Sequence, residues 1–186
     1  MLSIILFLFL FTSSISLAQS VNVGARLESL AYFYKNTIHN TNEVYFLPIP
    51  FSGYIKASIS YDKYELELKG GVQLGEIFAG AEYALELKYN LVGDIFPLLV
   101  YLNHNNSGEG GNTGGPYKNT IEFVGVGAEA KLTKLFGVDL IYYIPVGVSD
   151  LEYLNQVNSN YLSERKTKSK ITSMIKLGFI FNFNLF

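Results

Sequence analysis

The segment Ser169–Phe186, SKITSMIKLGFIFNFNLF, decides the fold class of this chain. Its odd-numbered positions are mostly apolar, whereas its even-numbered positions include Lys170, Lys176 and Asn182 and are largely polar. Because successive residues of a strand point to opposite faces, this alternation predicts a β-strand with one apolar face. A soluble protein would bury that face in a core, and a membrane barrel would turn it toward lipid.

The N-terminal residues indicate export. Ile4–Phe11 is an unbroken apolar run, and residues 13–18, which are mostly small, follow it. This layout is typical of a secretory signal peptide, although no Lys or Arg precedes the apolar run. The run is too short for an ordinary transmembrane helix. We therefore expect residues 1–18 to be a signal peptide cleaved after Ala18, and residues 19–186 to form one mature domain.

The composition favours strands and tight turns over helices. The 186 residues include 14 Tyr, 14 Phe and 17 Gly, but only 2 Met and no Trp. The absence of cysteine excludes a disulfide framework and thiolate metal sites, and two histidines give no basis for a transition-metal site. A net charge of −2 does not support nucleic-acid binding. We expect no cofactor.

The same alternation recurs along the chain and predicts eight strands. They are expected at residues 21–33, 51–61, 64–74, 79–91, 96–103, 120–132, 135–145 and 168–186. Tight turns are expected near Asp62, Gly93 and Thr133, and long loops at residues 35–50, 104–119 and 147–167. An even strand number lets an antiparallel barrel close with both termini on one side, and short turns opposite long loops are typical of outer-membrane barrels.

Aromatic residues flank the predicted tight turns and indicate a girdle at one rim of a barrel. They are Tyr61, Tyr64, Tyr89, Phe96 and Phe136, with the terminal Phe186 expected on the same rim. The alternation alone does not say which face is outside, so a soluble secreted sandwich or a lipocalin-like barrel is the competing interpretation. The signal peptide, the turn asymmetry, the girdle and the terminal strand together favour the membrane barrel.

With these features the chain resembles the small eight-stranded outer-membrane barrels of Gram-negative bacteria, such as the OmpX family and the transmembrane domain of OmpA. The resemblance covers residues 19–186 at the level of architecture. It implies an all-β, eight-stranded antiparallel up-and-down transmembrane barrel, monomeric and inserted into the outer membrane by the assembly machinery. Phe186 is one residue out of phase with Phe183 and Leu185, which departs from the usual assembly signal.

A barrel of this size has a lumen just wide enough to be filled by side chains. The face opposite the apolar one carries six basic and five acidic residues, which predict a cross-strand ion-pair network: Arg26, Glu28, Lys56, Glu65, Glu67, Lys69, Glu82, Glu86, Lys88, Lys170 and Lys176. Glu122 and Asp139 would join it if their strands keep the same parity. The near balance of charge favours a filled lumen, and a narrow small-solute channel is the alternative.

Two further expectations concern the outer end of the barrel. The strand directions place Lys35, Lys118, Arg165, Lys166 and Lys168 at the outer rim, where they could contact lipopolysaccharide phosphates or simply be solvated.

The second expectation concerns a catalytic pair, His104 and Ser107, as an alternative function. His104 and Ser107 raise the alternative of an esterase similar to lipid A 3-O-deacylases. The spacing differs from the His-x-Ser-Asn element of those enzymes, because Ser107 follows His104 by three residues and no Asn comes after it. The sequence therefore favours a non-enzymatic barrel whose external loops serve surface interactions.

Overall fold

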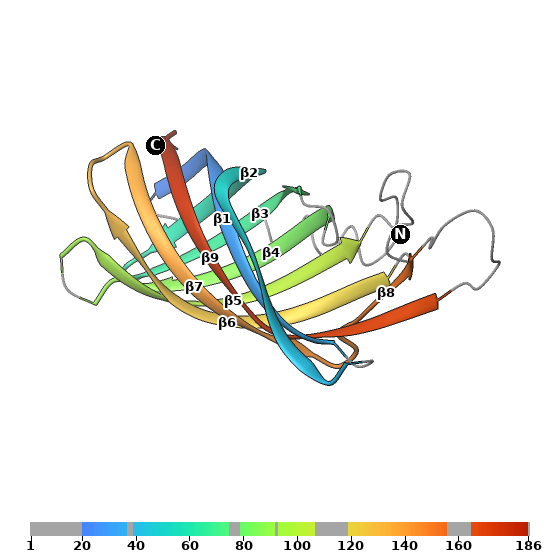
Figure 1. Ribbon diagram of the computed structural model, residues 1–186. Coiled ribbons are helices and arrows are strands. Elements are labelled where there is room, and N and C mark those ends of the chain that lie inside the picture. The colour runs from blue at the N-terminus through green and yellow to red at the C-terminus, as the bar shows by residue number, and fades with distance from the viewer. Residues whose placement is uncertain are drawn as a thin grey trace, which may run out of the picture.

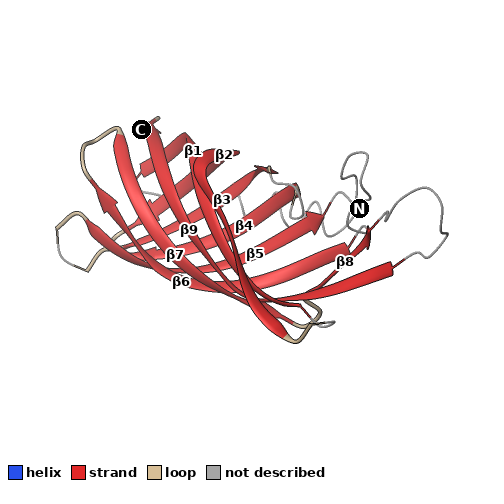
Figure 2. Ribbon diagram, in the orientation of Figure 1, coloured by secondary structure: helices blue, strands red, loops and turns tan. Residues whose placement is uncertain are grey.

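The computed structural model describes residues 20–36, 39–74, 79–91, 93–106, 119–155 and 165–185. Of these, residues 47–51, 119, 151–155 and 165–168 are described by their backbone alone. The expected signal peptide, residues 1–18, lies outside the described residues. Within the described ranges all regular secondary structure is β-strand (Figure 2). No helix there is long and apolar enough to cross a membrane.

Nine strands form one antiparallel sheet that closes on itself. They are β1 (Ser20–Asn36), β2 (Thr41–Tyr61), β3 (Tyr64–Gln73), β4 (Gly80–Tyr89), β5 (Ile95–Asn106), β6 (Asn119–Lys131), β7 (Phe136–Val146), β8 (Asp150–Asn155) and β9 (Arg165–Asn184). Each of β1 to β7 pairs with the next, β7 pairs with β9, and β9 pairs with β1. In Figure 1 the C-terminal end of β9 lies beside the β6–β7 turn, at the end opposite the β1–β2 hairpin. The predicted eight-stranded up-and-down barrel is confirmed.

The short strand β8 corrects the prediction of a continuous loop over residues 147–167. β9 pairs with β7 through residues 174–181 and with β8 through residues 165–170. β8 therefore continues the position of β7 beside β9 after an interruption. Gly147, at a φ of 81°, supplies the left-handed backbone that this interruption needs.

The first hairpin also extends further than predicted. Residues 35–50 were expected to form a loop, but β1 and β2 stay paired up to Asn36 and Thr41. The register between β1 and β2 shifts between Glu28 and Leu30, so an irregularity absorbs the extra β2 residues. His104 and Asn106 likewise belong to β5 rather than to the following loop.

The stagger of the strands sets the width of the barrel. Hydrogen-bonded partners traced once around the wall advance ten residues along β1: Ser20, Ser60, Glu65, Lys88, Leu98, Gly127, Ile141, Lys176 and Leu30. For eight strands this stagger gives a tilt of about 40° and a backbone radius of about 8 Å. Such a lumen holds side chains and little else.

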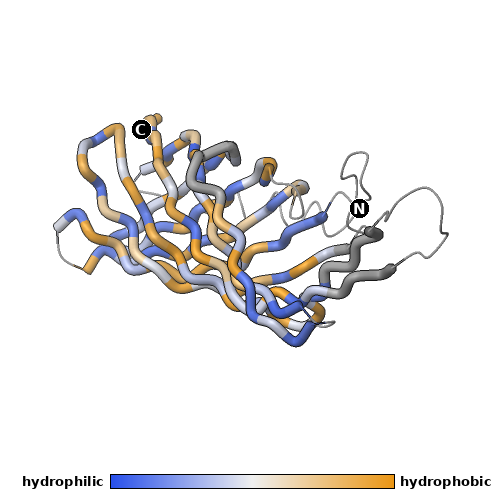
Figure 3. The backbone as a smooth tube through the Cα atoms, in the orientation of Figure 1, coloured by the Kyte–Doolittle hydropathy of each residue, from blue (hydrophilic) through white to orange (hydrophobic). Residues whose placement is uncertain are grey.

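The two faces of the wall have opposite character, which appears as alternating colours along the tube in Figure 3. Apolar side chains on the outside are exposed on every full-length strand, for example Leu27, Ile55, Leu68, Leu85, Leu99, Val126, Leu140 and Phe181. Charged side chains on all of these strands except β5 point inward. A closed barrel with charged groups inside and an apolar belt outside is the architecture of outer-membrane barrels.

The rim formed by the tight turns carries aromatic residues, with one correction. The Tyr64 and Tyr89 rings lie 5.2 Å apart, and those of Phe136 and Phe181 lie 5.5 Å apart. Phe96, predicted to belong to this girdle, is buried inside the barrel beneath the ammonium group of Lys131. Its parity on β5 places it with the lumen residues. Phe186 lies outside the described residues.

Candidate functional site: the lumen and the outer rim

Twelve charged side chains are buried inside the barrel among the described residues. Seven are acidic and five are basic: Glu28, Glu65, Glu67, Glu82, Glu86, Glu129, Asp139, Arg26, Lys56, Lys69, Lys88 and Lys176. We call this set the ion-pair cluster. Ten of its members belong to the predicted network. Buried charges need partners to offset the loss of hydration, so their contacts decide how the lumen is held together.

Arg26 is the centre of one half of the ion-pair cluster. Its guanidinium atoms lie 2.8 Å from Glu28 Oε1, 2.8 Å from Glu86 Oε1 and 2.6 Å from Asp139 Oδ2. These carboxylates come from β1, β4 and β7. The planar fork of Arg suits several carboxylates at once, so one side chain joins strands on opposite sides of the lumen.

Gly178 on β9 makes room for this centre. A Cβ atom at Gly178 would lie 2.6 Å from Asp139 Oδ1 and 2.7 Å from Arg26 Nε. Without it, the Gly178 backbone N–H donates to Asp139 Oδ1 at 3.1 Å. The glycine therefore permits the close approach of Arg26 and Asp139 to the β9 backbone.

Lys88 is the centre of the other half. Its Nζ lies 2.6 Å from Glu67 Oε2, 2.6 Å from Glu129 Oε2 and 3.4 Å from Glu65 Oε1. Lys56 donates to the same Glu67 oxygen at 2.6 Å. Three carboxylates thus share two buried ammonium groups. This half lies closer to the tight turns than the Arg26 half does.

A third group of contacts surrounds Glu82. Tyr54 donates to Glu82 Oε2 at 2.7 Å, and Lys176 donates to the same oxygen. His104 Nδ1 lies 2.9 Å from Glu82 Oε1. Lys176 also lies 3.0 Å from Glu28, which links this group to Arg26. The contacts around Glu82 and those around Arg26 therefore form one connected group.

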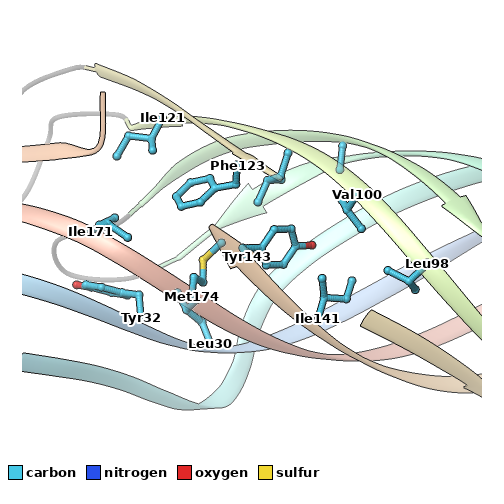
Figure 4. Close-up of a cluster of buried hydrophobic side chains, with 12 residues drawn as sticks. Leu30, Tyr32, Leu98, Val100, Ile121, Phe123, Ile141, Tyr143, Ile171 and Met174 are labelled. Carbon is cyan, nitrogen blue, oxygen red and sulfur yellow. The ribbon is translucent and has the colours of Figure 1, made fainter. Parts of the chain in front are cut away.

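The remaining part of the lumen is apolar, which was not predicted. Its residues come mainly from β5, β6 and β7 and from the outer halves of β1 and β9: Leu30, Tyr32, Ala84, Leu98, Val100, Leu102, Ile121, Phe123, Ile141, Tyr143, Ile171 and Met174. Figure 4 shows these side chains extending from the surrounding strands into the interior. The Phe123 and Tyr143 rings meet edge to face, with centroids 6.4 Å apart. We call this set the apolar plug.

Lys170 corrects the predicted network, because its side chain is exposed on the outside of the barrel. Tyr34 pairs with Ile171 and Phe33 pairs with Ser173, so Thr172 is an extra residue in β9. This β-bulge reverses the parity of β9. Ile171 therefore faces the lumen, and the Lys170 before it faces outward.

The parity of β6 accounts for a second difference. Glu122, expected to join the network, is exposed on the outside, whereas Glu129 is fully buried beside Lys88. Asp139 lies in the cluster as its parity on β7 predicts. The sequence did not identify Glu129, because the inward positions of β6 also carry Ile121 and Phe123 and resemble an outward face.

The outer-rim cations are only partly described. The Lys35 side chain is exposed near the outer end of β1. Arg165, Lys166 and Lys168 belong to β9, but their side chains lie outside the described residues, as does the whole of Lys118.

Of the two residues of the esterase alternative, the structure describes only His104. His104 is fully buried in the lumen, and Ser107 lies outside the described residues. A catalytic base must reach its substrate, and His104 instead contacts Glu82 of the ion-pair cluster. No group of His, Asp and Glu side chains suited to a metal ion occurs in the described part of the chain.

Comparison with known proteins gives structural matches only. No protein-family model matches the chain, and no curated protein matches it significantly. Among solved structures, the chain is similar to the N-terminal β-barrel domain of OprF from Pseudomonas aeruginosa, with 18% identity, a TM-score of 0.45, and coverage of 89% of this chain and 98% of that chain. It is also similar to the outer membrane protein OprG from the same organism (12% identity, TM-score 0.45, coverage 89% and 97%) and to Neisserial surface protein A (10% identity, TM-score 0.38, coverage 88% and 97%).

Proposed function

We propose that this chain is a non-enzymatic integral protein of a bacterial outer membrane, exported by its signal peptide. The observation that carries the proposal is the inversion of the wall, with charges buried inside and large apolar side chains exposed outside. In water such an apolar surface would be far larger than soluble monomers expose. Against lipid it is the stable arrangement.

The dimensions of the barrel support this proposal. β3 and β4 have ten residues each, and ten residues tilted by about 40° rise about 25 Å, which is the height of an outer-membrane apolar band. On β5 and β6 the apolar outward residues give way to Asn103, Asn105 and Thr120, where Thr120 donates to Asn105 at 2.8 Å. We take this polar change as the outer edge of the apolar belt.

We further propose that the barrel does not conduct solutes. The ion-pair cluster occupies the lumen toward the tight turns, and the apolar plug occupies it toward the loops. A solute would have to break buried ion pairs and then displace the packed apolar side chains. Discrete conductance steps in planar bilayers would overturn this part and favour the small-solute channel.

The outward cations suggest the surface role. We propose that the rim containing Lys35 contacts phosphate groups of lipopolysaccharide, because charge-assisted hydrogen bonds to phosphate are strong. Lys118, Arg165, Lys166 and Lys168 would contribute to this contact as the strand directions predict. We propose no reaction, since the buried His104 is held by Glu82.

Heat-modifiable gel mobility of the refolded chain tests the central proposal. Residues 19–186 would be refolded in detergent and in lipid vesicles and run with and without boiling. A folded membrane barrel should migrate differently from the boiled chain and should float with the vesicles. A chain that stays soluble without detergent and shows no mobility shift would contradict the proposal.

A further inference from the structure

We propose that Lys35 and Lys170 together bind the phosphomonoester group of an outer-leaflet lipid, on the outward face of β1 and β9. This inference rests on the proposed outer-membrane location and names the ligand group and the two residues that hold it. Lys170 was expected inside the barrel, so the pair arises only from the folded structure.

The register places the two lysines directly opposite each other. Lys35 pairs with Lys170 across the β1–β9 ladder, and both side chains are exposed. Directly opposite residues have Cβ atoms about 4.5–5.5 Å apart, and like charges in this position destabilise a sheet. Among the described side chains neither ammonium group forms an ion pair with a carboxylate. An anion between them would turn the repulsion into a favourable contact.

The β-bulge at Thr172 creates this pair. Without the extra residue, the parity of Met174 and Lys176 would continue to Lys170 and turn it into the lumen. Thr172 Oγ1 donates to the Phe33 carbonyl oxygen at 3.1 Å and so connects the bulge to β1. Bulges commonly re-aim a side chain at the rim of a barrel. Here the bulge re-aims Lys170 toward Lys35.

The surroundings favour a phosphate that belongs to a lipid. Toward the apolar belt, the outward positions of the same two strands carry Phe33, Ile175, Leu177 and Leu27. A lipid whose phosphate reached the lysines could lay its acyl chain along these residues. Asp150 on β8 pairs in register with Lys170 and offsets part of its charge. One net positive charge remains, and it attracts a phosphomonoester, which carries about −1.5 to −2 at pH 7, more strongly than a singly charged phosphodiester.

Native mass spectrometry of the detergent-refolded mature chain tests the pair. Phosphatidic acid supplies a phosphomonoester, phosphatidylglycerol a phosphodiester, phosphatidylcholine a neutral reference, and inorganic phosphate a free anion. The double variant Lys35→Gln, Lys170→Gln would be compared with Lys63→Gln, Lys134→Gln, which removes two exposed lysines at the tight turns. We expect the Kd for phosphatidic acid to rise roughly tenfold in the first variant and to stay unchanged in the second.

Three results would overturn the inference. Equal affinity of both variants for phosphatidic acid would show that the lysine pair is not the site. No preference of the wild type for phosphatidic acid over phosphatidylcholine would exclude recognition of the phosphomonoester. Competition by inorganic phosphate at equal concentration would identify a free-anion site instead of a lipid site.

Heat-modifiable mobility of every variant separates this inference from the proposed function. Variants that fold and float with vesicles but bind alike contradict the lysine pair alone. A wild type that does not enter lipid contradicts both.

Discussion

Different kinds of side chain fill the lumen on the two sides of the barrel, β1 to β4 and β5 to β7. On β1 to β4 many inward residues are charged or polar and the outward ones are mostly apolar, so the alternation is visible in the sequence. On β5 to β7 both faces are apolar: Leu98 and Val100 are buried inside, and Leu99 between them is exposed outside. The charged wall depends on ion pairs, whereas the apolar wall depends on close packing.

The comparison shows why a lumen can combine both kinds of wall. Arg26 on β1 reaches Asp139 on β7, and Lys88 on β4 reaches Glu129 on β6, so the charged wall uses two anchors from the apolar side. The apolar plug lies closer to the loops. Its side chains contain few polar atoms and therefore need few hydrogen-bond partners. The difference predicts different responses to substitution on the two walls, from the largest loss of stability at Arg26 to the smallest at Leu99.

Replacing Arg26 should have the largest effect. Arg26→Met leaves Glu28, Glu86 and Asp139 without their shared cation, and breaking a buried ion pair destabilises by about 3–5 kcal/mol. Urea titration of the chain folded in vesicles would measure the loss. Lys63→Met, at an exposed turn, should change stability little, and a similar loss in both variants would contradict the role of Arg26.

The second-largest loss of stability is expected from shortening a side chain of the apolar wall. Leu98 is 4% exposed inside the barrel, and Leu98→Ala should destabilise by about 3 kcal/mol through lost burial and a cavity. The same urea titration measures it. A loss much smaller than this would contradict the close packing of the apolar wall.

Gly178→Ala tests the contact between the walls at the β9 backbone. The added Cβ would lie 2.6 Å from Asp139 Oδ1, and the overpacking should cost about 1–3 kcal/mol. Gly53→Ala is the matched control, because its Cβ would meet only Leu27 Cδ2, at 3.9 Å. Equal stability of the two variants would contradict the close approach at Gly178.

The smallest effect is expected on the lipid face of the apolar wall. Leu99 is 58% exposed outside the barrel. The chain unfolded in urea lies in water, so Leu99→Ala should lose only the transfer of the removed carbon atoms from water to lipid, about 1–2 kcal/mol, because lipid fills the space and leaves no cavity. A loss as large as that of Leu98→Ala would place Leu99 in a packed protein interface.

The charged wall accounts for most of what the sequence could predict. Glu65, Glu67 and Lys69 mark the inward face of β3 because charges recur at every second position. The turn after Tyr61 was also predictable, since Asp62 tolerates the left-handed φ of 52° that it adopts. Regular alternation and turn-forming residues therefore carry the strand count and the topology.

The remaining differences have local physical causes. An apolar residue such as Phe96 or Phe123 fits either face of a barrel whose lumen is partly apolar, so parity gives no answer there. The Thr172 bulge depends on pairing with β1, a strand more than 130 residues earlier, and no local pattern signals it. Lys170 could therefore be placed outside only by the folded register.

Spin-label accessibility along β4 and β5 tests the inverted wall most directly. The chain has no cysteine, so single cysteines at Ala84, Leu85, Tyr101 and Leu102 can each carry one nitroxide in vesicle-folded protein. Labels at Leu85 and Tyr101 should be relaxed by oxygen and not by a water-soluble nickel chelate, whereas labels at Ala84 and Leu102 should be shielded from both. Strong relaxation by the nickel chelate at Leu85 and Tyr101, or equal oxygen accessibility at all four positions, would contradict a lipid-facing belt around a filled lumen.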